Sequence, residues 1–371
     1  MNDEQKTRYN RQIILHNFGE EAQEKLLNAK VLVIGAGGLG CPALQYLAAA
    51  GVGTIGIVDG DTISLSNLHR QILFTNRDIG KNKTTAAAKQ LKKANPEIII
   101  NEYPFFITTE SAIEIIRHYD IVVDCTDNFA TRYLINDASV LMEKPLIFGA
   151  IYQYEGQVAV FNLQDENGIA IQYRHLFPVP TSKDDAPDCS SAGVLGILPG
   201  IIGIMQATET IKIITGIGAA LINKIATYNA LTNDLFTIDI TESYQKKISA
   251  PQNESEFKKM DYEAFCSSHF DIIRQIDADD FSVFVKKKNV AIIDVRELNE
   301  MPLAKFRHQK FPFSEWKNLI PEITENEIVI FCQSGKRSVK AAQILYELYG
   351  SEKKIYSLQD GILSLKQNDN F

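Results

Sequence analysis

The sequence KVLVIGAGGLGCPALQYLAAAGVGTIGIVDGD, residues 30–61, decides the fold of this chain. The apolar run Val31–Ile34 predicts a buried strand, and a glycine-rich turn and an apolar helical pattern to Ala50 follow it. A second apolar run, Thr54–Val58, ends at Asp59. A strand, a glycine turn, a helix and a second strand that ends in an acid form a βαβ unit of the kind that binds nucleotides.

Three glycines in this turn support nucleotide binding. Gly35, Gly37 and Gly40 let the backbone turn tightly and approach a phosphate at the N-terminus of the following helix. Asp59 is placed to accept hydrogen bonds from a ribose. A glycine-rich turn can be purely structural, but the flanking strands and the terminal acid favour a Rossmann-like α/β domain with a nucleotide site.

Length and composition limit the class of protein. A chain of 371 residues predicts two domains, and its net charge of −8 offers no electrostatic footprint for nucleic acid. The cysteines are widely spaced, odd in number and without a CxxC pair, which argues for a reducing cytoplasm and against a disulfide scaffold; they are Cys41, Cys125, Cys189, Cys266 and Cys332. No apolar segment reaches membrane-spanning length without polar interruption, so we expect a cytoplasmic protein.

The segment after Asp59 concentrates groups that hold a polyphosphate and its metal. These groups are Asp61, Asn67, Arg70 and Gln71. Lys83 begins a predicted alanine-rich helix, where the positive end of the helix dipole disfavours a cation. A lysine at that position therefore suggests an anionic ligand.

A further acid follows the predicted strand Tyr119–Asp124. The strand ends in Cys125-Thr126-Asp127-Asn128, and ligands of open α/β sheets bind beyond the carboxyl ends of strands. We therefore expect Asp127 in the same crevice as Asp59, holding Mg²⁺ or a ribose. The alternative is that Asp127 caps the helix that follows.

Composition changes mark the rest of the chain. Leu163–Ser190 is predicted to be irregular, and Pro199–Thr215 predicts a buried helix. The polar stretch 246–276 predicts a linker between a first domain, residues 1–245, and a small second α/β domain, residues 277–371.

The second domain contains the strongest catalytic signal. The predicted strand Glu327–Phe331 runs directly into Cys332-Gln333-Ser334-Gly335-Lys336-Arg337 and then into a helix. Inward-pointing backbone N–H groups, a helix N-terminus and two cations are features that stabilise an anionic sulfur. An inert buried cysteine is the weaker interpretation.

This cysteine loop resembles that of rhodanese-type sulfurtransferases. Four residues separate Cys332 from Arg337, and a cradle of six residues suits a persulfide, whereas related phosphatases use a longer loop. The sequence DVRE at Asp294–Glu297 supports the same family. The chain departs from it after Asp360, where rhodaneses commonly show paired glycines and a tryptophan and this chain has Gly361-Ile362-Leu363.

The first domain has two interpretations. A GxGxxG turn followed by Asp59 would also suit the NAD of a dehydrogenase. Against a dehydrogenase stand groups suited to ATP, Mg²⁺ and a reacting phosphate, namely Asp61, Asn67, Arg70, Lys83 and Asp127.

The motifs RYNRQI, IGAGGLG, VDGDTISLSNLHRQ, GKNK and DCTDN resemble the ubiquitin-activating-like adenylyltransferases of molybdopterin and thiamine biosynthesis, the MoeB/ThiF type. The resemblance runs from about Arg8 to Ile240. With the rhodanese-like segment, the whole chain resembles the fused adenylyltransferase–sulfurtransferase form of that family.

The resemblance implies roles for individual residues. Arg11, which alone would be taken as surface charge, would reach the nucleotide of the neighbouring subunit in a homodimer. Cys189 would form a covalent link to the carrier protein, although a structural cysteine is an alternative. Asp127 would also hold Mg²⁺. The residues implied to bind ATP are Gly35, Gly37, Gly38, Gly40, Asp59, Asp61, Ser66, Asn67, Leu68, His69, Arg70, Gln71, Lys83, Asp127 and Asn128.

Relatives usually bind a structural zinc through two CxxC pairs. This chain has Gln172-Tyr173-Arg174-His175 at the first pair and no cysteine within Glu242–Pro251 at the second. We therefore expect no structural zinc, and we expect His175 to be an ordinary polar residue.

The expected function is ATP-dependent adenylation of the C-terminal glycine of a small ubiquitin-like sulfur carrier. Arg11, Arg70 and Lys83 would offset the developing charge, and a persulfide on Cys332 would then give a thiocarboxylate. The expected pathway is molybdenum cofactor biosynthesis, with thiamine biosynthesis or tRNA thiolation as alternatives. A cysteine desulfurase is an expected persulfide donor, and a protein that only docks the carrier is the non-enzymatic alternative.

Overall fold

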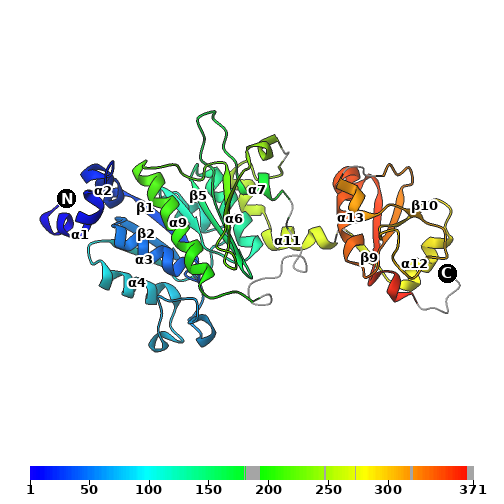
Figure 1. Cartoon of the computed structure of the whole chain (residues 1–371), viewed down its shortest axis with the longest axis horizontal. Helices are drawn as coiled ribbons and strands as arrows, with labels where there is room; N and C mark the ends of the chain where they lie inside the picture. Colours follow the sequence, from blue (N-terminus) through cyan, green and yellow to red (C-terminus); the bar gives the residue numbers. More distant parts are fainter. Residues whose placement is uncertain (179, 181–192, 246–247, 272, 318–320, 366–371) are drawn as a thin grey trace. The chain divides into compact units, whose positions relative to one another are not determined.

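The computed structural model describes residues 1–365 except 179, 181–192, 246–247, 272 and 318–320. The chain forms two compact units, Met1–Cys266 and Ser267–Phe371 (Figure 1). No helix in the described ranges is both long enough and apolar enough to cross a membrane.

The first unit is built on an eight-stranded sheet with the order β3-β2-β1-β4-β5-β6-β7-β8. Neighbouring strands from β3 to β5 are parallel, and those from β5 to β8 are antiparallel. The strands are β1 (Lys30–Ile34), β2 (Thr54–Val58), β3 (Ile99–Tyr103), β4 (Ile121–Asp124), β5 (Leu146–Tyr152), β6 (Glu155–Phe161), β7 (Lys224–Asn229) and β8 (Leu235–Asp239). This arrangement confirms the predicted Rossmann-like α/β fold with a mixed sheet.

Helices cover both faces of this sheet. One apolar core includes side chains of α3 (Gly40–Ala50), α4 (Lys83–Ala94) and α9 (Leu198–Thr215), and Figure 1 shows α3 and α9 side by side. The other core includes side chains of α5 (Ala112–Ile116), α6 (Phe129–Leu141), α7 (Tyr173–Leu176), α10 (Glu254–Lys259) and α11 (Tyr262–Asp271). The strands between the two cores are apolar on both faces, as parallel strands covered by helices require.

Two N-terminal helices precede β1. These are α1 (Asp3–Ile13) and α2 (Gly19–Asn28). The Asn2 side chain accepts a hydrogen bond from the N–H of Gln5, and Gln5 returns a bond to the N–H of Asn2. This capping box fixes the start of α1, and Arg11 lies in the last turn of the same helix.

The second unit has a five-stranded parallel sheet with the order β11-β10-β12-β13-β9. Its strands are β9 (Arg274–Ile276), β10 (Val290–Asp294), β11 (Gln309–Lys310), β12 (Glu327–Phe331) and β13 (Lys354–Leu358), and its helices are α12 (Ala278–Lys286) and α13 (Lys336–Tyr349). Apolar cores lie on both faces of this sheet as well.

The segment 246–276, predicted to be a linker, is largely folded. Phe257 of α10 and Tyr262 of α11 are buried in the first unit, and β9 belongs to the sheet of the second. Buried aromatic residues anchor these short helices to the first unit. The average composition of the segment is polar, so it did not predict the helices. The segment predicted to be irregular likewise contains the short helix α7.

A buried ion pair occupies the position where the resemblance expects the first cysteine pair. Nε and Nη2 of Arg174 each donate to a carboxylate oxygen of Asp137 at 2.7 Å. The Tyr262 hydroxyl donates to the same carboxylate at 2.7 Å, and the guanidinium lies over the rings of Tyr133 and Phe265. Burial and the adjacent carboxylate raise the pKa of Tyr262, so its hydroxyl stays protonated. The network joins α6, α7 and α11.

Replacing Asp137 by asparagine should destabilise the first unit by about 3–5 kcal/mol, because the buried Arg174 guanidinium then lacks a counter-charge. Urea unfolding followed by circular dichroism measures this loss. The control is Glu21→Gln, which removes the exposed ion pair between Glu21 and Lys25. A loss of stability no larger than that of the control would contradict a structural role for the Asp137–Arg174 pair.

Candidate functional site

The register of the central strands brings the predicted site residues to one edge of the first sheet. Ile34 pairs with Val58 on one side and with Asp124 on the other, so the chain leaves all three strands at the same level. Asp59 follows at this edge and accepts a hydrogen bond from the N–H of Ala36 at 2.7 Å. The glycine turn, Asp59 and the turn after β4 therefore meet, as predicted.

Asp59 holds the turn in addition to facing the site. Its second carboxylate oxygen accepts a hydrogen bond from the N–H of Asp61 at 2.8 Å. Burial raises the pKa of the Asp59 carboxyl, while the nearby Lys83 and these two backbone bonds act in the opposite direction.

Close packing leaves little or no room for a side chain at three glycines of the turn. Gly35 has φ of +96°, and a Cβ there would lie 2.7 Å from the carbonyl oxygen of Cys125. A Cβ on Gly40 would lie 1.9 Å from the Gly35 carbonyl oxygen. A Cβ on Gly38 would meet Pro199 of α9 at 3.0 Å. These glycines allow β4, α3 and α9 to approach one another closely.

Gly37 differs from the other three because the space beside it is open. The nearest neighbour of a Cβ there would be Nε2 of Gln71, at 3.8 Å. In the described part of the chain, no acceptor binds the backbone N–H groups of Gly37, Gly38, Leu39 or Gly40. Oε1 of the buried Gln71 also lacks a hydrogen-bond partner among the described residues. Unpaired donors at a helix N-terminus, with room beside them, suit a phosphate.

Two cations lie beside this turn. Lys83 is only 6% exposed, and its Nζ lies 2.7 Å from Asp61 and 3.9 Å from Asp59. The Cγ of Arg70 would lie 3.4 Å from a Cβ on Gly38. The anionic partner that the sequence predicted for Lys83 is, in this structure, the carboxylate of Asp61.

The segment from Ser66 to His69 shapes the loop that carries Arg70. Asn67 accepts a hydrogen bond from the N–H of Ser64, and Leu68 packs against the apolar core. Nη1 of Arg70 donates to the Ser66 carbonyl at 3.1 Å and lies 2.7 Å from Nε2 of His69. These contacts hold the Arg70 guanidinium on its own loop, while the Cγ of the same side chain lies beside Gly38.

The segment that precedes α9 packs on the same loop. A Cβ on Gly196 would lie 2.7 Å from the carbonyl oxygen of His69 and 2.9 Å from its Nδ1. Cys189 lies outside the described residues.

The turn after β4 separates the roles of Asp127 and Asn128. The Asn128 side chain caps α6 by accepting a hydrogen bond from the N–H of Thr131 at 2.9 Å. Asp127 is exposed, and no described residue bonds its carboxylate. The helix cap that was the alternative role of Asp127 is therefore Asn128, and the Asp127 carboxylate is available to a ligand.

Sequence reasoning missed Arg132, which supports this turn. Nη2 of Arg132 donates to the Thr126 carbonyl at 3.0 Å, and Thr126 donates to the buried Asp124 through its N–H and its hydroxyl. Burial raises the pKa of Asp124, and the Arg132 charge opposes that rise. The position of Arg132, four residues after Asn128 on one helix face, is the signal that could have revealed it.

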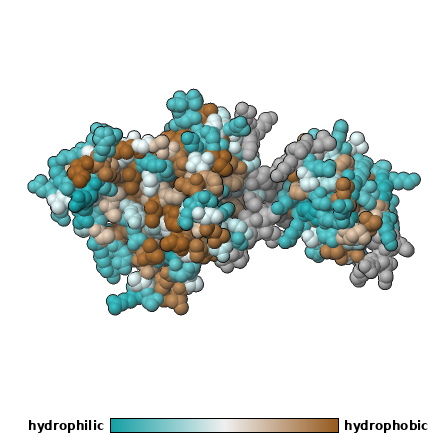
Figure 2. Space-filling model, viewed as in Figure 1, coloured by the Kyte–Doolittle hydropathy of each residue, from teal (hydrophilic) through white to brown (hydrophobic). Residues whose placement is uncertain are grey.

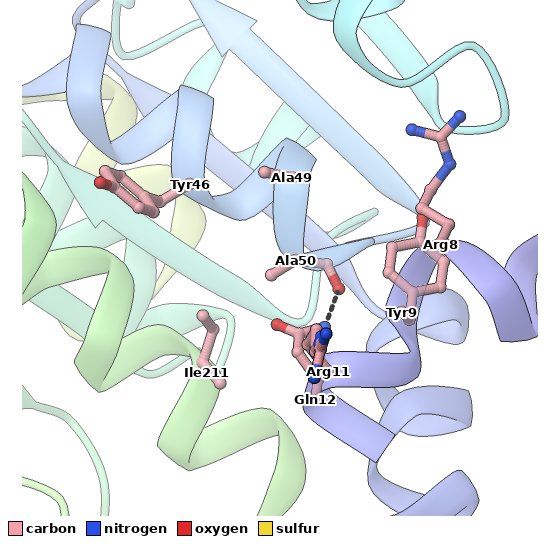
Figure 3. A pocket seen from close by; sticks show the side chains of 8 residues that line it. All are labelled: Arg8, Tyr9, Arg11, Gln12, Tyr46, Ala49, Ala50 and Ile211. Atoms are coloured by element: carbon pink, nitrogen blue, oxygen red, sulfur yellow. Dashed lines mark hydrogen bonds between the residues drawn. The ribbon is translucent and has the colours of Figure 1, made fainter. Parts of the chain in front are cut away.

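Arg11 is not brought to the glycine turn of its own chain. It lines a cavity of about 270 Å³ at the far end of α3 (Figure 3). The eleven residues of α3 span about 16 Å, which separates this cavity from Gly40. Arg11 is exposed, and no bond to a described residue engages its guanidinium. The cavity is lined by Arg8, Tyr9, Arg11, Gln12, Tyr46, Ala49, Ala50 and Ile211.

The second unit places Cys332 between β12 and α13, as predicted. Its side chain is 1% exposed, and Sγ donates to the Ser338 hydroxyl at 3.5 Å. Ser338 in turn donates to the Gly335 carbonyl and accepts a bond from the Ser357 hydroxyl. Within the described residues, no acceptor binds the backbone N–H groups from Gln333 to Ser338. This cradle of free donors suits an anionic sulfur.

The departure from the rhodanese pattern near the C-terminus does not disturb this loop. The N–H of Ile362 donates to the Cys332 carbonyl at 2.8 Å. Gly361 has φ of +64°, and a Cβ there would lie 2.5 Å from that carbonyl oxygen. Asp360 also has positive φ, +57°. The one retained glycine is therefore the one that the close approach requires.

Two arginines of the Cys332 region form ion pairs, Arg337 with Glu300 and Arg296 with Asp294. Both carboxylate oxygens of Glu300, which the sequence analysis did not single out, lie 2.5 Å from the guanidinium nitrogens of Arg337. This bond lowers the pKa of Glu300 to about 2. In the DVRE segment, Arg296 forms a buried ion pair with Asp294 and donates to the Pro302 carbonyl at 2.6 Å. Lys336 is exposed.

Comparison with known proteins identifies relatives of both segments. A sulfur carrier protein adenylyltransferase of Thermus thermophilus is 47% identical over 71% of this chain and 97% of its own length. The probable adenylyltransferase/sulfurtransferase MoeZ of Mycobacterium tuberculosis is 37% identical over 91% of this chain and 87% of its own. The adenylyltransferase and sulfurtransferase MOCS3 of Xenopus laevis is 35% identical over 97% and 86%. The predicted enzyme class is confirmed, because relatives that match most of the chain are named for both activities.

Solved structures share the fold of the first unit. PaaA has a TM-score of 0.55 with 24% identity over 65% of this chain and 75% of its own. Escherichia coli MccB bound to MccA-N7isoASN also has a TM-score of 0.55, with 24% identity over 64% and 72%. The ThiF family pattern matches residues 9–250 and so includes the glycine turn, Asp59, Lys83 and Asp127. The chain is therefore a member of the ThiF family.

Proposed function

We propose that this chain adenylates the C-terminal glycine of a small ubiquitin-like sulfur carrier with ATP and then supplies sulfur from a persulfide on Cys332. The observation that carries the first step is the set of free N–H groups beside Gly37, with Arg70 and Lys83 next to them. The name of the Thermus thermophilus relative supports a sulfur carrier as the substrate.

In this proposal the first unit binds the phosphates and the ribose of ATP at separate groups. The free N–H groups at the start of α3 bind phosphate oxygens, and Asp59 faces the ribose. The unpaired Oε1 of Gln71 accepts a hydrogen bond from the nucleotide or from an ordered water.

Cations offset the charge that develops as the carrier carboxylate attacks the α-phosphate. Arg70 lies beside the turn, and Lys83 reaches the phosphates when its Nζ leaves Asp61. The free carboxylate of Asp127 fits Mg²⁺, which, if it were held there, would neutralise part of the phosphate charge. Pyrophosphate leaves, and the carrier carries an acyl-adenylate.

A homodimer would bring Arg11 to this reaction. Figure 2 shows apolar side chains gathered on the face of the first unit that α9 crosses. Exposed apolar residues of the neighbouring helices include Tyr46 of α3, Ile204 of α9 and Ile197 at the N-cap of α9. A second copy that covers this face would bury them and would place Arg11 near the partner's nucleotide.

The second step transfers sulfur. The terminal sulfur of the Cys332 persulfide attacks the acyl carbon, a carbon–sulfur bond forms, and AMP leaves with the electron pair of the broken carbon–oxygen bond. Cys189 then attacks Cys332 to form a disulfide, and the sulfur–sulfur bond to the acyl group breaks, which releases the thiocarboxylate. A thiol reductant restores both cysteines, and a cysteine desulfurase is our proposed source of the persulfide.

The carrier decides the pathway. We propose molybdenum cofactor biosynthesis, with thiamine biosynthesis or tRNA thiolation as the alternatives. A dehydrogenase is disfavoured because relatives that match most of the chain are named adenylyltransferases and sulfurtransferases. A protein that only docks the carrier would not need the free N–H groups around Cys332.

The carrier is tested by ATP–pyrophosphate exchange with candidate carriers that either retain or lack the terminal glycine. We expect exchange only with an intact carrier tail, because its carboxylate is the nucleophile. Absence of exchange with every ubiquitin-like carrier would overturn the activating-enzyme proposal.

Single substitutions should separate the two steps. Asp127→Ala should lower carrier adenylation by about 100-fold or more and leave thiosulfate:cyanide sulfurtransferase activity intact. Cys332→Ala should abolish sulfur transfer and spare adenylation. If both folded variants lose both activities, this division of labour is wrong.

The glycines of the turn should respond differently to alanine. Gly37→Ala should fold normally but weaken ATP binding tenfold or more, because the new methyl group fills space meant for phosphate. Gly40→Ala should instead destabilise the first unit by about 1–3 kcal/mol, because its Cβ would overlap the Gly35 carbonyl. Calorimetric titration of ATP and urea unfolding measure the two effects. Unchanged ATP affinity of Gly37→Ala would contradict a phosphate at this position.

A further inference from the structure

A carboxylate stands beside the Cys332 loop although sulfur transfer does not require one. Both oxygens of Glu300 bond Arg337, and the side chains of Glu300 and Arg337 are 26% and 31% exposed. The pair is therefore open to solvent at the edge of the loop rather than part of the core.

Further hydrogen bonds hold the segment with Glu300 against the loop. Nε2 of Gln333 donates to the Met301 carbonyl at 2.7 Å, and the N–H of Glu297 donates to Oε1 of Glu300 at 2.9 Å. The carboxylate thus has a defined position. Arg337 lies in the first turn of α13, five residues after Cys332 in the chain, and its bond to Glu300 raises its pKa.

We propose that Glu300 is a specificity-determining residue of the sulfur site, which disfavours small dianionic sulfur donors by neutralising Arg337. The proposal rests on the proposed function, because it concerns the step that loads Cys332 with sulfur. It names the class of donor that the site rejects.

Thiosulfate is the simplest donor of the rejected class. The Cys332 thiolate attacks its outer sulfur, a sulfur–sulfur bond to Cys332 forms, and the bond to the sulfite sulfur breaks. Sulfite leaves with the electron pair and two negative charges. A free Arg337 would attract this dianion before and during the reaction, whereas the Arg337–Glu300 pair has no net charge and the carboxylate repels it.

The exposed apolar residues of the same segment also disfavour an inorganic dianion. Leu298, Met301 and Leu303 are each at least 64% exposed. Apolar side chains beside the loop offer nothing to a strongly hydrated inorganic anion. A cysteine persulfide whose only charge is on its sulfur loses less hydration free energy in such surroundings.

The experiment compares the full-length protein with Glu300→Gln, which keeps the shape of the side chain and removes its charge. The first readout is kcat/KM for Cys332 persulfide formation from thiosulfate. We expect Glu300→Gln to raise it at least tenfold, mainly through a lower KM. Added salt should change the wild-type rate little, because the Arg337–Glu300 pair is neutral, and should decrease the Glu300→Gln rate by screening attraction to the free Arg337.

Two control variants separate the local charge from other effects. Glu327→Gln removes one negative charge and one ion pair, to Lys287, at the opposite end of β12, and the Glu327 side chain is 28% exposed. Its rate with thiosulfate should stay within about twofold of the wild type, because the lost charge is distant and screened. Glu300→Asp keeps the charge but alters the geometry, so its rate should stay low.

A neutral donor distinguishes failure of this inference from failure of the proposed function. The persulfide of a blocked, uncharged cysteine should load wild-type and Glu300→Gln protein at similar rates. If it loads Cys332 but Glu300→Gln shows no gain with thiosulfate, Glu300 does not set specificity. If Glu300→Asp gains as much as Glu300→Gln, shape rather than charge is responsible and the inference is wrong. If no donor loads Cys332 in any variant, the proposed function fails with it.

Discussion

The in-register pairing of β1 with β2 and β4 is the constraint on which the first unit depends. Because Ile34 lies level with Val58 and Asp124, the glycine turn, Asp59 and the turn with Asp127 leave the sheet together. The bond from Ala36 to Asp59 then fixes the glycine turn against the neighbouring strand. A slip of one residue would move the acids away from the helix N-terminus and would remove the site.

Both units use the same physical device for different chemistry. In each, a parallel strand ends in a tight turn whose backbone N–H groups lack acceptors within the described residues, at the start of a helix. The first turn has open space beside Gly37 and cations at Arg70 and Lys83, which suits a polyphosphate. The second surrounds the buried Cys332, and its free N–H groups suit an anionic sulfur.

In each site a cation is bonded to a carboxylate of the same unit. Lys83 bonds Asp61, and Arg337 bonds Glu300, so neither cation is free before its ligand arrives. A ligand must compete for these cations, which favours ligands of matching charge and geometry over other anions. The buried Arg174–Asp137 pair has another role, since it joins helices α6 and α7, and Tyr262 connects it to α11.

The sequence by itself determined the strand–turn–helix units around Gly35 and Cys332, because hydrophobic periodicity and glycine turns act over a few neighbouring residues. It also placed Asp59, Lys83 and Asp127, since strand ends and helix starts are local features. Only the tertiary structure decided that Gly40 serves packing while Gly37 leaves room, that Arg174 meets Asp137, and that Glu300 neutralises Arg337. Those facts depend on contacts between residues far apart in the chain. A local sequence pattern does not determine which distant side chain a residue contacts in the folded protein.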